Sequence, residues 1–319
     1  MKTLRNIITL LGLLTLLLSA CGGKTPTPQG EELQGTITIS GAFALYPMMT
    51  RWAEEFQKVH PGVQFDISAG GAGKGMVDAL AGAVDIGMVS RDVTPEEEEQ
   101  GAYWVAVTID AVFPVVNAQN PVLQDFLAKG IPRETFAQIF ITGEITTWGE
   151  VVGRPEVTDE IHLYTRSDAC GAAETWAKYL GGKQENLLGI GVYGDPGLLD
   201  AVIRDPLGIG YNNLNYAYDM TTGKPVTGAT ILPIDVNENG TADPDEILET
   251  KEEAVNAVAT GIYPSPPARA LNLVTKGKPT GLVQIFIEWV LTDGQQYVSE
   301  AGYISLTPEQ LEASLQKIR

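Results

Sequence analysis

Residues 164–176 join a fixed positive charge to the expected start of a helix. A strand over 161–165 leads to Arg166, and apolar residues recur at helical spacing from Ala172 to Leu180. The first turn of a helix leaves backbone N–H groups without partners and carries the positive end of the helix dipole. An arginine beside such a turn predicts a site for a small anion, while a surface arginine before an ordinary helix is the alternative.

Three further strands, earlier in the chain, end in glycine-rich or polar residues. In a parallel α/β sheet such segments gather at the carboxyl ends of the strands, where ligands bind. The glycine-rich loop 69–75 is not a P-loop, because Gly75 stands where a P-loop has Ser or Thr. The strands and the residues that follow them are 36–40 with 41–44, 63–68 with 69–75, and 84–89 with Ser90 and Arg91.

The order of these stretches resembles the phosphate-binding proteins that supply ABC transporters. The resemblance implies an α/β protein with the two-lobed periplasmic-binding-protein fold, in which each lobe is a mixed sheet flanked by helices and the chain crosses a hinge twice. It implies lobe one at 35–110 plus 263–319 and lobe two at 111–262, with an anion held between them. The matching stretches are 40–47, 70–76, 85–91, 165–171, 207–211, 275–279 and 294–306.

The same resemblance implies a ligand-binding set drawn from these loops. The expected contacts are Ala42, Phe43, Ala44, Gly71, Ala72, Gly73, Ser90, Arg91, Arg166, Asp168, Cys170, Gly171 and Ala172. The family usually has hydroxyl side chains here, whereas this chain has alanine, phenylalanine or cysteine at several of the positions. Backbone N–H groups and Arg166 remain, and each hydrogen bond to a charged ligand contributes about 1.5–3 kcal/mol. Phosphate is the expected ligand, and a larger oxyanion or an organic anion is the alternative.

Two charged members of this set have a second interpretation. Arg91 and Asp168 either contact the ligand or pair with neighbouring side chains. In contact with the ligand, the Asp168 carboxylate would accept the proton of a protonated oxyanion, which favours phosphate over sulfate.

Cys170 is also a candidate nucleophile, because a position at a helix start lowers the pKa of a thiol. Nucleophilic catalysis needs a base nearby. The two histidines are His60, in a loop, and His162, within a strand, so the spacing gives no Cys–His arrangement. We therefore expect no enzymatic activity, and we interpret Cys170 as a small buried residue.

A second site is predicted between residues 235 and 246, which match the EF-hand calcium loop at every position. Gly240 supplies the sharp turn at the sixth place, and calcium prefers hard oxygen ligands. A strand over 230–234 precedes the loop and a helix over 247–259 follows it, so a structural Ca²⁺ site is expected, with an ordinary acidic turn as the alternative. The expected ligands are Asp235, Asn237, Asn239, Thr241 through its carbonyl, Asp243 and Glu246.

The N-terminus predicts export. Lys2 and Arg5 precede an apolar run over 7–18, and small residues lead to Cys21. This arrangement resembles the lipobox of bacterial lipoproteins, which implies a signal peptide at 1–20, lipidation of Cys21 and a flexible tether at 21–34. An uncleaved membrane anchor is the alternative, although the apolar run is short for a bilayer. Either interpretation places the folded part outside the cytoplasm.

The charge balance narrows the partners. The chain has 21 basic and 40 acidic residues and a formal net charge of −19, which argues against nucleic acid as a partner. A small anion in a cleft is still compatible, because salt screens exposed charges beyond about 8 Å. We expect a lipid-anchored monomer that captures phosphate and delivers it to an ABC permease in the membrane. A sensor or adhesion lipoprotein without a transport role is the alternative.

Overall fold

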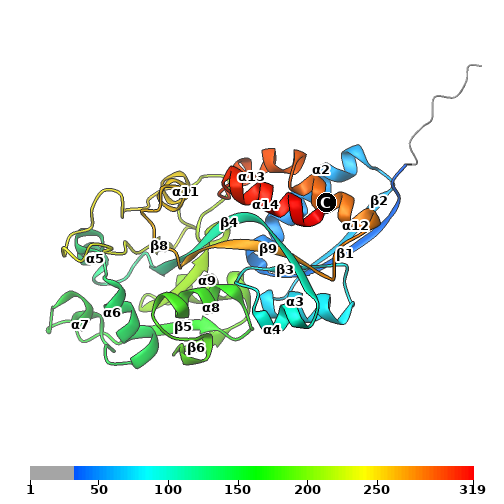
Figure 1. Ribbon diagram of the computed structural model, residues 1–319. Coiled ribbons are helices and arrows are strands. Elements are labelled where there is room, and N and C mark those ends of the chain that lie inside the picture. The colour runs from blue at the N-terminus through cyan, green and yellow to red at the C-terminus, as the bar shows by residue number, and fades with distance from the viewer. Residues whose placement is uncertain (1–31) are drawn as a thin grey trace, which may run out of the picture. The chain divides into compact units, whose positions relative to one another are not determined.

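The computed structural model describes residues 32–319, so the predicted signal peptide, Cys21 and most of the predicted tether lie outside the described residues. Strands and helices alternate along the chain, as an α/β protein requires (Figure 1). The strands are β1 Gly35–Gly41, β2 Val63–Ala69, β3 Ile86–Val89, β4 Ala102–Asn117, β5 His162–Arg166, β6 Ile190–Val192, β7 Gly208–Asn213, β8 Ala229–Ile231 and β9 Ala268–Lys276.

The helices differ widely in length, and among the described residues none is both long and apolar enough to cross a membrane. The α-helices are α2 Tyr46–Val59, α3 Ala72–Ala81, α4 Pro95–Glu99, α5 Leu123–Lys129, α6 Arg133–Ala137, α7 Trp148–Val152, α8 Gly171–Tyr179, α9 Gly194–Arg204, α10 Leu214–Ala217, α11 Lys251–Thr260, α12 Gly281–Val290, α13 Gln296–Glu300 and α14 Pro308–Ile318. The other helical turns are η1 Phe43–Leu45, η2 Gln138–Thr142, η3 Gln184–Asn186 and η4 Asp293–Gln295.

The strands within residues 32–319 form one hydrogen-bonded path in the order β2-β1-β3-β9-β4-β7-β5-β6, with β8 also on β4. At one end β1 pairs parallel with β2 and β3, and at the other β5 pairs parallel with β6 and β7. The long strands β4 and β9 pair antiparallel with each other and join the two parallel groups. The predicted α/β class with mixed sheets is confirmed.

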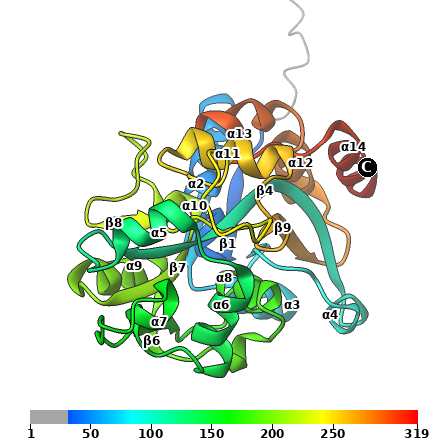
Figure 2. The ribbon, with the colours of Figure 1, turned by 90° about the vertical axis from the view of Figure 1, so that its left-hand side faces the viewer.

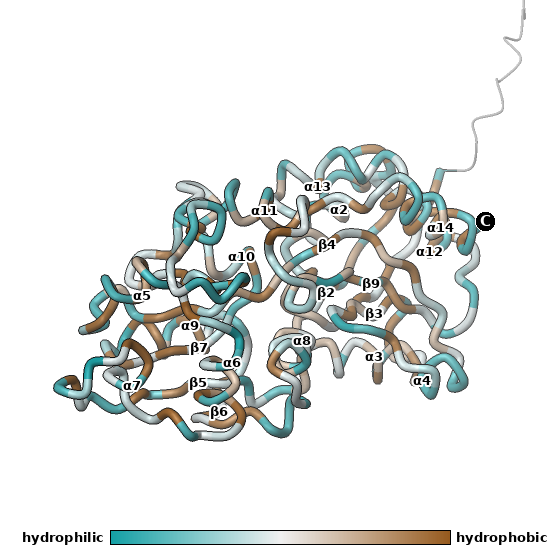
Figure 3. The backbone as a smooth tube through the Cα atoms, turned by 60° about the vertical axis from the view of Figure 1, so that its left-hand side comes forward, coloured by the Kyte–Doolittle hydropathy of each residue, from teal (hydrophilic) through white to brown (hydrophobic). Residues whose placement is uncertain are grey.

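Two clusters of buried apolar side chains lie along this path. The first is built from residues 37–107 and 271–318, and the second from residues 111–268 together with Ile304. Figure 1 shows β4 and β9 running side by side from one group of helices to the other, and Figure 3 shows hydrophobic stretches along β7 and β9. Tyr263, Ala268 and Ile304, which were expected in lobe one, pack in the second cluster, because β9 begins beside the part of β4 that belongs to that cluster.

Local sequence explains where the helices that matter for the site begin and which faces they bury. Pro47 occupies the first turn of α2, and Trp52 on its buried face donates from Nε1 to the Gly294 carbonyl at 2.8 Å. The helix expected over 247–259 begins only at Lys251, because Thr250 caps it through a capping box with Glu253.

Candidate anion-binding site

Three of the predicted loops meet at the starts of α3 and α8, which lie side by side in Figures 2 and 3. The Gly73 N–H donates to the Ala169 carbonyl at 3.0 Å. A Cβ added to Gly171 would lie 2.1 Å from the carbonyl oxygen of Ser90 and 2.3 Å from its hydroxyl oxygen. The Ser90 hydroxyl therefore lies against the first turn of α8, and only glycine fits at position 171.

The first predicted loop, residues 41–44, reaches these loops through Phe43. Its ring lies over the Arg166 guanidinium, with 5.3 Å between Cζ of Arg166 and the ring centroid. Its carbonyl accepts a hydrogen bond from the Tyr216 hydroxyl at 3.4 Å. The neighbouring Ala42 and Ala44 are buried, as are Ala72 and Ala172 at the starts of α3 and α8. The predicted loops thus converge around Arg166.

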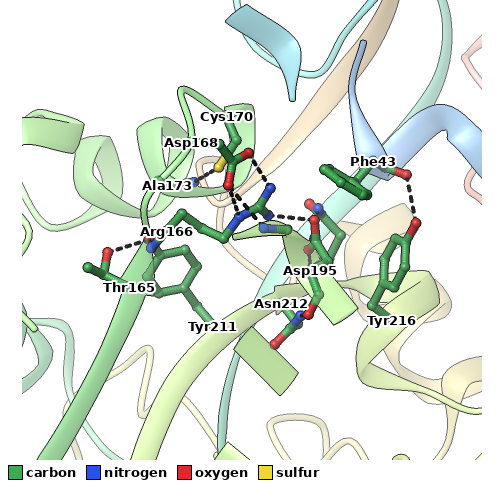
Figure 4. A network of polar contacts seen from close by, with 12 residues as sticks. Phe43, Thr165, Arg166, Asp168, Cys170, Ala173, Asp195, Tyr211, Asn212 and Tyr216 are labelled. Atoms are coloured by element: carbon green, nitrogen blue, oxygen red, sulfur yellow. Dashed lines mark hydrogen bonds and ion pairs between the residues drawn. The ribbon is translucent and has the colours of Figure 1, made fainter. Parts of the chain in front are cut away.

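Arg166 is held between two carboxylates, as Figure 4 shows. Its Nε and Nη2 donate to Asp168 at 2.8 and 2.6 Å, and its Nη1 donates to Asp195 at 2.5 Å. Burial opposes the charge of the guanidinium, whose side chain is 1 % exposed, but the charges of Asp195 and Asp168 and the hydrogen bonds to Asp168 outweigh burial and raise the pKa of Arg166 well above its usual value. Arginine has five N–H donors, so two remain for a ligand after these three bonds.

Several backbone donors in the converging loops are unused. The N–H groups of Phe43, Ala44, Gly171 and Ala172 make no hydrogen bond to any residue between 32 and 319. The next N–H group in α8, that of Ala173, is by contrast capped by the Cys170 sulfur at 3.4 Å. Because the Arg166 charge is already matched by two carboxylates, these N–H groups are the donors of the loops that remain available to an anion.

For Arg91 and Asp168 the structure shows the pairing interpretation. Arg91 donates to both carboxylate oxygens of Glu97 at 2.8 and 2.6 Å, and its Nε lies 3.2 Å from Glu174 on α8. It lines a cavity of about 640 Å³ at the edge of the loops instead of facing Arg166. Asp168 orients Arg166, and its Oδ1 also accepts from the Gly194 N–H at 3.1 Å.

Cys170 is buried at the start of α8. It is 5 % exposed, and burial raises the pKa of its thiol to about 12 despite the nearby Arg166 charge. The expected lowering of the pKa by the helix start is thus wrong, because burial is the larger effect. Neither histidine serves as its base: His162 pairs with Asp205 at 2.7 Å, and the His60 ring packs on Phe56.

Asp195, which pairs with Arg166, is the residue of the candidate site that the sequence interpretation missed. It is fully buried, and besides Arg166 it accepts hydrogen bonds from the backbone N–H and the side-chain amide of Asn213, at 3.2 and 2.7 Å. A signal was present, because Gly194-Asp195-Pro196 follows a short strand and opens a helix, as the other loops do.

The contacts continue from Asn213 to the two crossing strands. Arg269 on β9 donates to the Asn213 side chain, to Asp110 on β4 at 3.1 Å and to the Ser90 carbonyl at 3.2 Å. Burial raises the pKa of Asp110 to about 6, although Arg269 lowers it, and its Oδ1 has no partner among the described residues. Arg269 therefore connects the loop of Ser90 to the Asn213–Asp195–Arg166 contacts on the other side. The types of Asp110 and Arg269 alone gave no signal in the sequence that the two residues would pair.

The predicted calcium loop folds back on its own side chains, apart from the anion site. Asp235 accepts from the N–H groups of Asn239 and Gly240 at 3.1 and 2.9 Å, and Glu246 accepts from those of Val236 and Asp243 at 2.7 and 3.0 Å. The side-chain amides of Asn237 and Asn239 both donate to Asp243, and the Thr241 N–H donates to Asn239. Within residues 32–319, no three carboxylate, imidazole or thiol groups are gathered around one point.

Known proteins share this architecture. The PBP superfamily domain matches residues 26–294. The phosphate-binding protein PstS of Bacillus subtilis (strain 168) is 30% identical over 94% of this chain and 93% of its own, and the PstS of Methanocaldococcus jannaschii is 27% identical over 89% and 86%.

Solved structures agree on the fold. A phosphate ABC transporter substrate-binding protein from Clostridium perfringens, described as having bound phosphate, superposes with a TM-score of 0.69 at 23% identity, covering 86% of this chain and 100% of its own. An ABC-type phosphate transport receptor from Vibrio cholerae gives a TM-score of 0.61 at 19% identity over 85% and 100%. The chain therefore belongs to the PBP superfamily, in the same family as the phosphate-binding proteins named PstS.

Proposed function

We propose that this chain is an extracytoplasmic solute-binding protein that captures phosphate between two lobes and presents it to an ABC permease. The observation that carries the proposal is the set of unused N–H groups of Phe43, Ala44, Gly171 and Ala172 in the converging loops. They come from segments far apart in sequence, and the names of the relatives point to the same ligand.

Recognition follows from these donors. Backbone N–H groups at the starts of η1 and α8, the Ser90 hydroxyl and two free N–H groups of Arg166 surround the anion. Each hydrogen bond to a charged group contributes about 1.5–3 kcal/mol, so a few of them reach the roughly 8 kcal/mol of micromolar binding. Opening the lobes separates Ser90 from Gly171 and Gly73 from Ala169, which admits the anion.

Ser90→Ala tests the side-chain part of this site. Losing the hydroxyl is expected to weaken phosphate binding about tenfold, in isothermal titration of the mature protein, because one hydrogen bond to a charged ligand is lost. Ser167→Ala is the control, since Ser167 is exposed in the same loop as Arg166. Equal phosphate affinity of Ser90→Ala and wild type would remove Ser90 from the site.

Two further observations test the ligand and the transport role. If the wild type gives no heat with phosphate but binds another anion, the ligand is that anion. An absence of neighbouring permease genes would favour the sensor or adhesion role.

The location and assembly belong to the same proposal. Export by a lipoprotein signal and lipidation at Cys21 would hold a monomer beside its permease, on a tether of residues 21–34. Cys21→Ala is expected to release the protein from the membrane fraction. Retention in that fraction after the change would favour an uncleaved anchor. We propose no catalytic role, because the thiol of Cys170 stays protonated at neutral pH.

We also propose that residues 235–246 bind Ca²⁺ as a structural ion. Asp235 and Glu246 are buried, and their carboxylates accept hydrogen bonds from N–H groups of the loop. A bound Ca²⁺ would place a full positive charge beside these carboxylates. Calcium at 100 times its dissociation constant is expected to stabilise the fold by about 2.7 kcal/mol, seen as a rise in melting temperature. Glu246→Gln should abolish the rise, whereas Glu249→Gln, just outside the loop, should leave it unchanged. If calcium leaves the melting temperature of the wild type unchanged, the segment is an ordinary acidic turn.

A further inference from the structure

Phe43 is the one large side chain that the first loop sends across to the other lobe. Its ring meets the rings of Tyr193 and Tyr216 edge to face, with centroids 5.9 and 6.4 Å apart, and it covers the Arg166 guanidinium. Figure 4 shows the ring between Arg166 and Tyr216. Since Ala42 and Ala44 on either side are small, Phe43 supplies the bulk of this wall.

Gly194 shapes the surface that receives the ring. Its φ of +74° favours glycine, and an added Cβ would lie 3.1 Å from Cζ of Phe43. The same residue donates its N–H to Asp168, which in turn orients Arg166. The backbone that seats the phenylalanine ring is therefore also the backbone that positions the guanidinium.

We propose that Phe43 determines the size of the ligand: its ring closes the anion site over Arg166 and restricts it to a compact inorganic oxyanion. The two free N–H groups of Arg166 lie in the plane of the guanidinium, so an anion binds at its edge while Phe43 occupies its face. An organic substituent directed at that face meets the ring. The inference rests on the proposed phosphate binding and specifies the ligand class within it.

Removing the ring tests the inference by chemical complementation. Phenylphosphonate carries a phenyl group of the size that Phe43→Ala removes. Isothermal titration of the wild type is expected to show phosphate at least about 100-fold tighter than phenylphosphonate, and Phe43→Ala should narrow the ratio to about tenfold or less. Phosphate itself should weaken only about three- to tenfold, the loss of one cation–π contact. Phe43→Leu should lie between the two.

Tyr297→Ala is the matched control. Tyr297 makes the same kind of contact with Arg51, whose Cζ lies 5.1 Å from its ring centroid, on the surface of lobe one. Tyr297→Ala should lower the melting temperature and leave the ratio of phosphate to phenylphosphonate affinity unchanged. Circular dichroism identifies any unfolded variant, and Phe43→Leu then carries the test because it keeps most of the apolar volume.

The outcomes separate the two proposals. Phosphate binding by the wild type with an unchanged ligand ratio in both Phe43 variants would overturn the role of Phe43 and leave the proposed function standing. Wild-type protein that binds no phosphate would overturn the proposed function and this inference with it. Tight binding of phenylphosphonate by the wild type would overturn the size limit alone.

Discussion

Replacing Arg166 by methionine is expected to abolish phosphate binding and to destabilise the fold by about 3–5 kcal/mol, because the change leaves Asp168 and Asp195 buried without their counter-charge. Two N–H donors to the ligand are lost as well. The affinity for phosphate should fall by about 100-fold or more, measured by titration calorimetry, and the unfolding midpoint in urea should fall with it.

A triple variant separates the two effects. Arg166→Met combined with Asp168→Asn and Asp195→Asn removes the buried charges together, and we expect it to recover much of the lost stability without recovering binding. Arg91→Met is the control, since Arg91 also pairs with two carboxylates but at the edge of the loops, and its phosphate affinity should stay within about threefold of wild type. A triple variant that binds phosphate normally would show that Arg166 only supports the fold.

Replacing Arg269 by methionine is expected to have the second-largest effect, because it breaks contacts between the crossing strands and the site. Asp110 would be left as a fully buried carboxylate, which costs about 3–5 kcal/mol at neutral pH. The Ser90 carbonyl and Asn213 would each lose a donor, so phosphate binding should weaken about tenfold.

The pH dependence distinguishes this pair from an ordinary packing defect. Burial raises the pKa of Asp110 from 3.8 to about 6, so between these values the folded protein binds more protons than the unfolded chain. The free energy of unfolding therefore falls as pH rises through this window, by about 3 kcal/mol in total from this group. Asp110→Asn should remove this group's contribution to the fall, which denaturant titrations below and above pH 6 would show.

The double variant Asp110→Asn with Arg269→Met completes the test. It leaves no buried charge at this position and should be more stable at pH 7 than Arg269→Met alone, with denaturant titrations at several pH values as the measurement. A wild-type free energy of unfolding that rises between pH 4 and 6 in step with that of Asp110→Asn would show that Asp110 is not titrating there.

The fold class and the positions of the loops could be predicted from the sequence because both depend on local sequence patterns. Glycine-rich or polar turns after alternating or apolar strands predicted β1, β2, β3 and β5 and the loops that follow them, whereas the binding of an anion by these loops stays a prediction. Pro47 predicted the start of α2, and the helical spacing of apolar residues around Trp176 predicted α8.

Contacts between residues far apart in the chain could not be predicted in the same way. Asp195, Asn213 and Arg269 are separated along the chain from Arg166 and Asp110, and their contacts exist only once β4, β7 and β9 are in register. The sequence also gave no measure of burial, which decides the pKa of Cys170, or of the space that the Phe43 ring fills.

The pairing of β4 with β9 has a mechanical consequence. The two crossings are neighbours in one ladder, from Ala102 beside Lys276 to Ala111 beside Ala268, with a register shift between Ala106 and Thr108. Any rotation of one lobe against the other would therefore have to twist this paired ribbon as a unit, and we expect its ladder of hydrogen bonds to resist twisting more than two separate connections would.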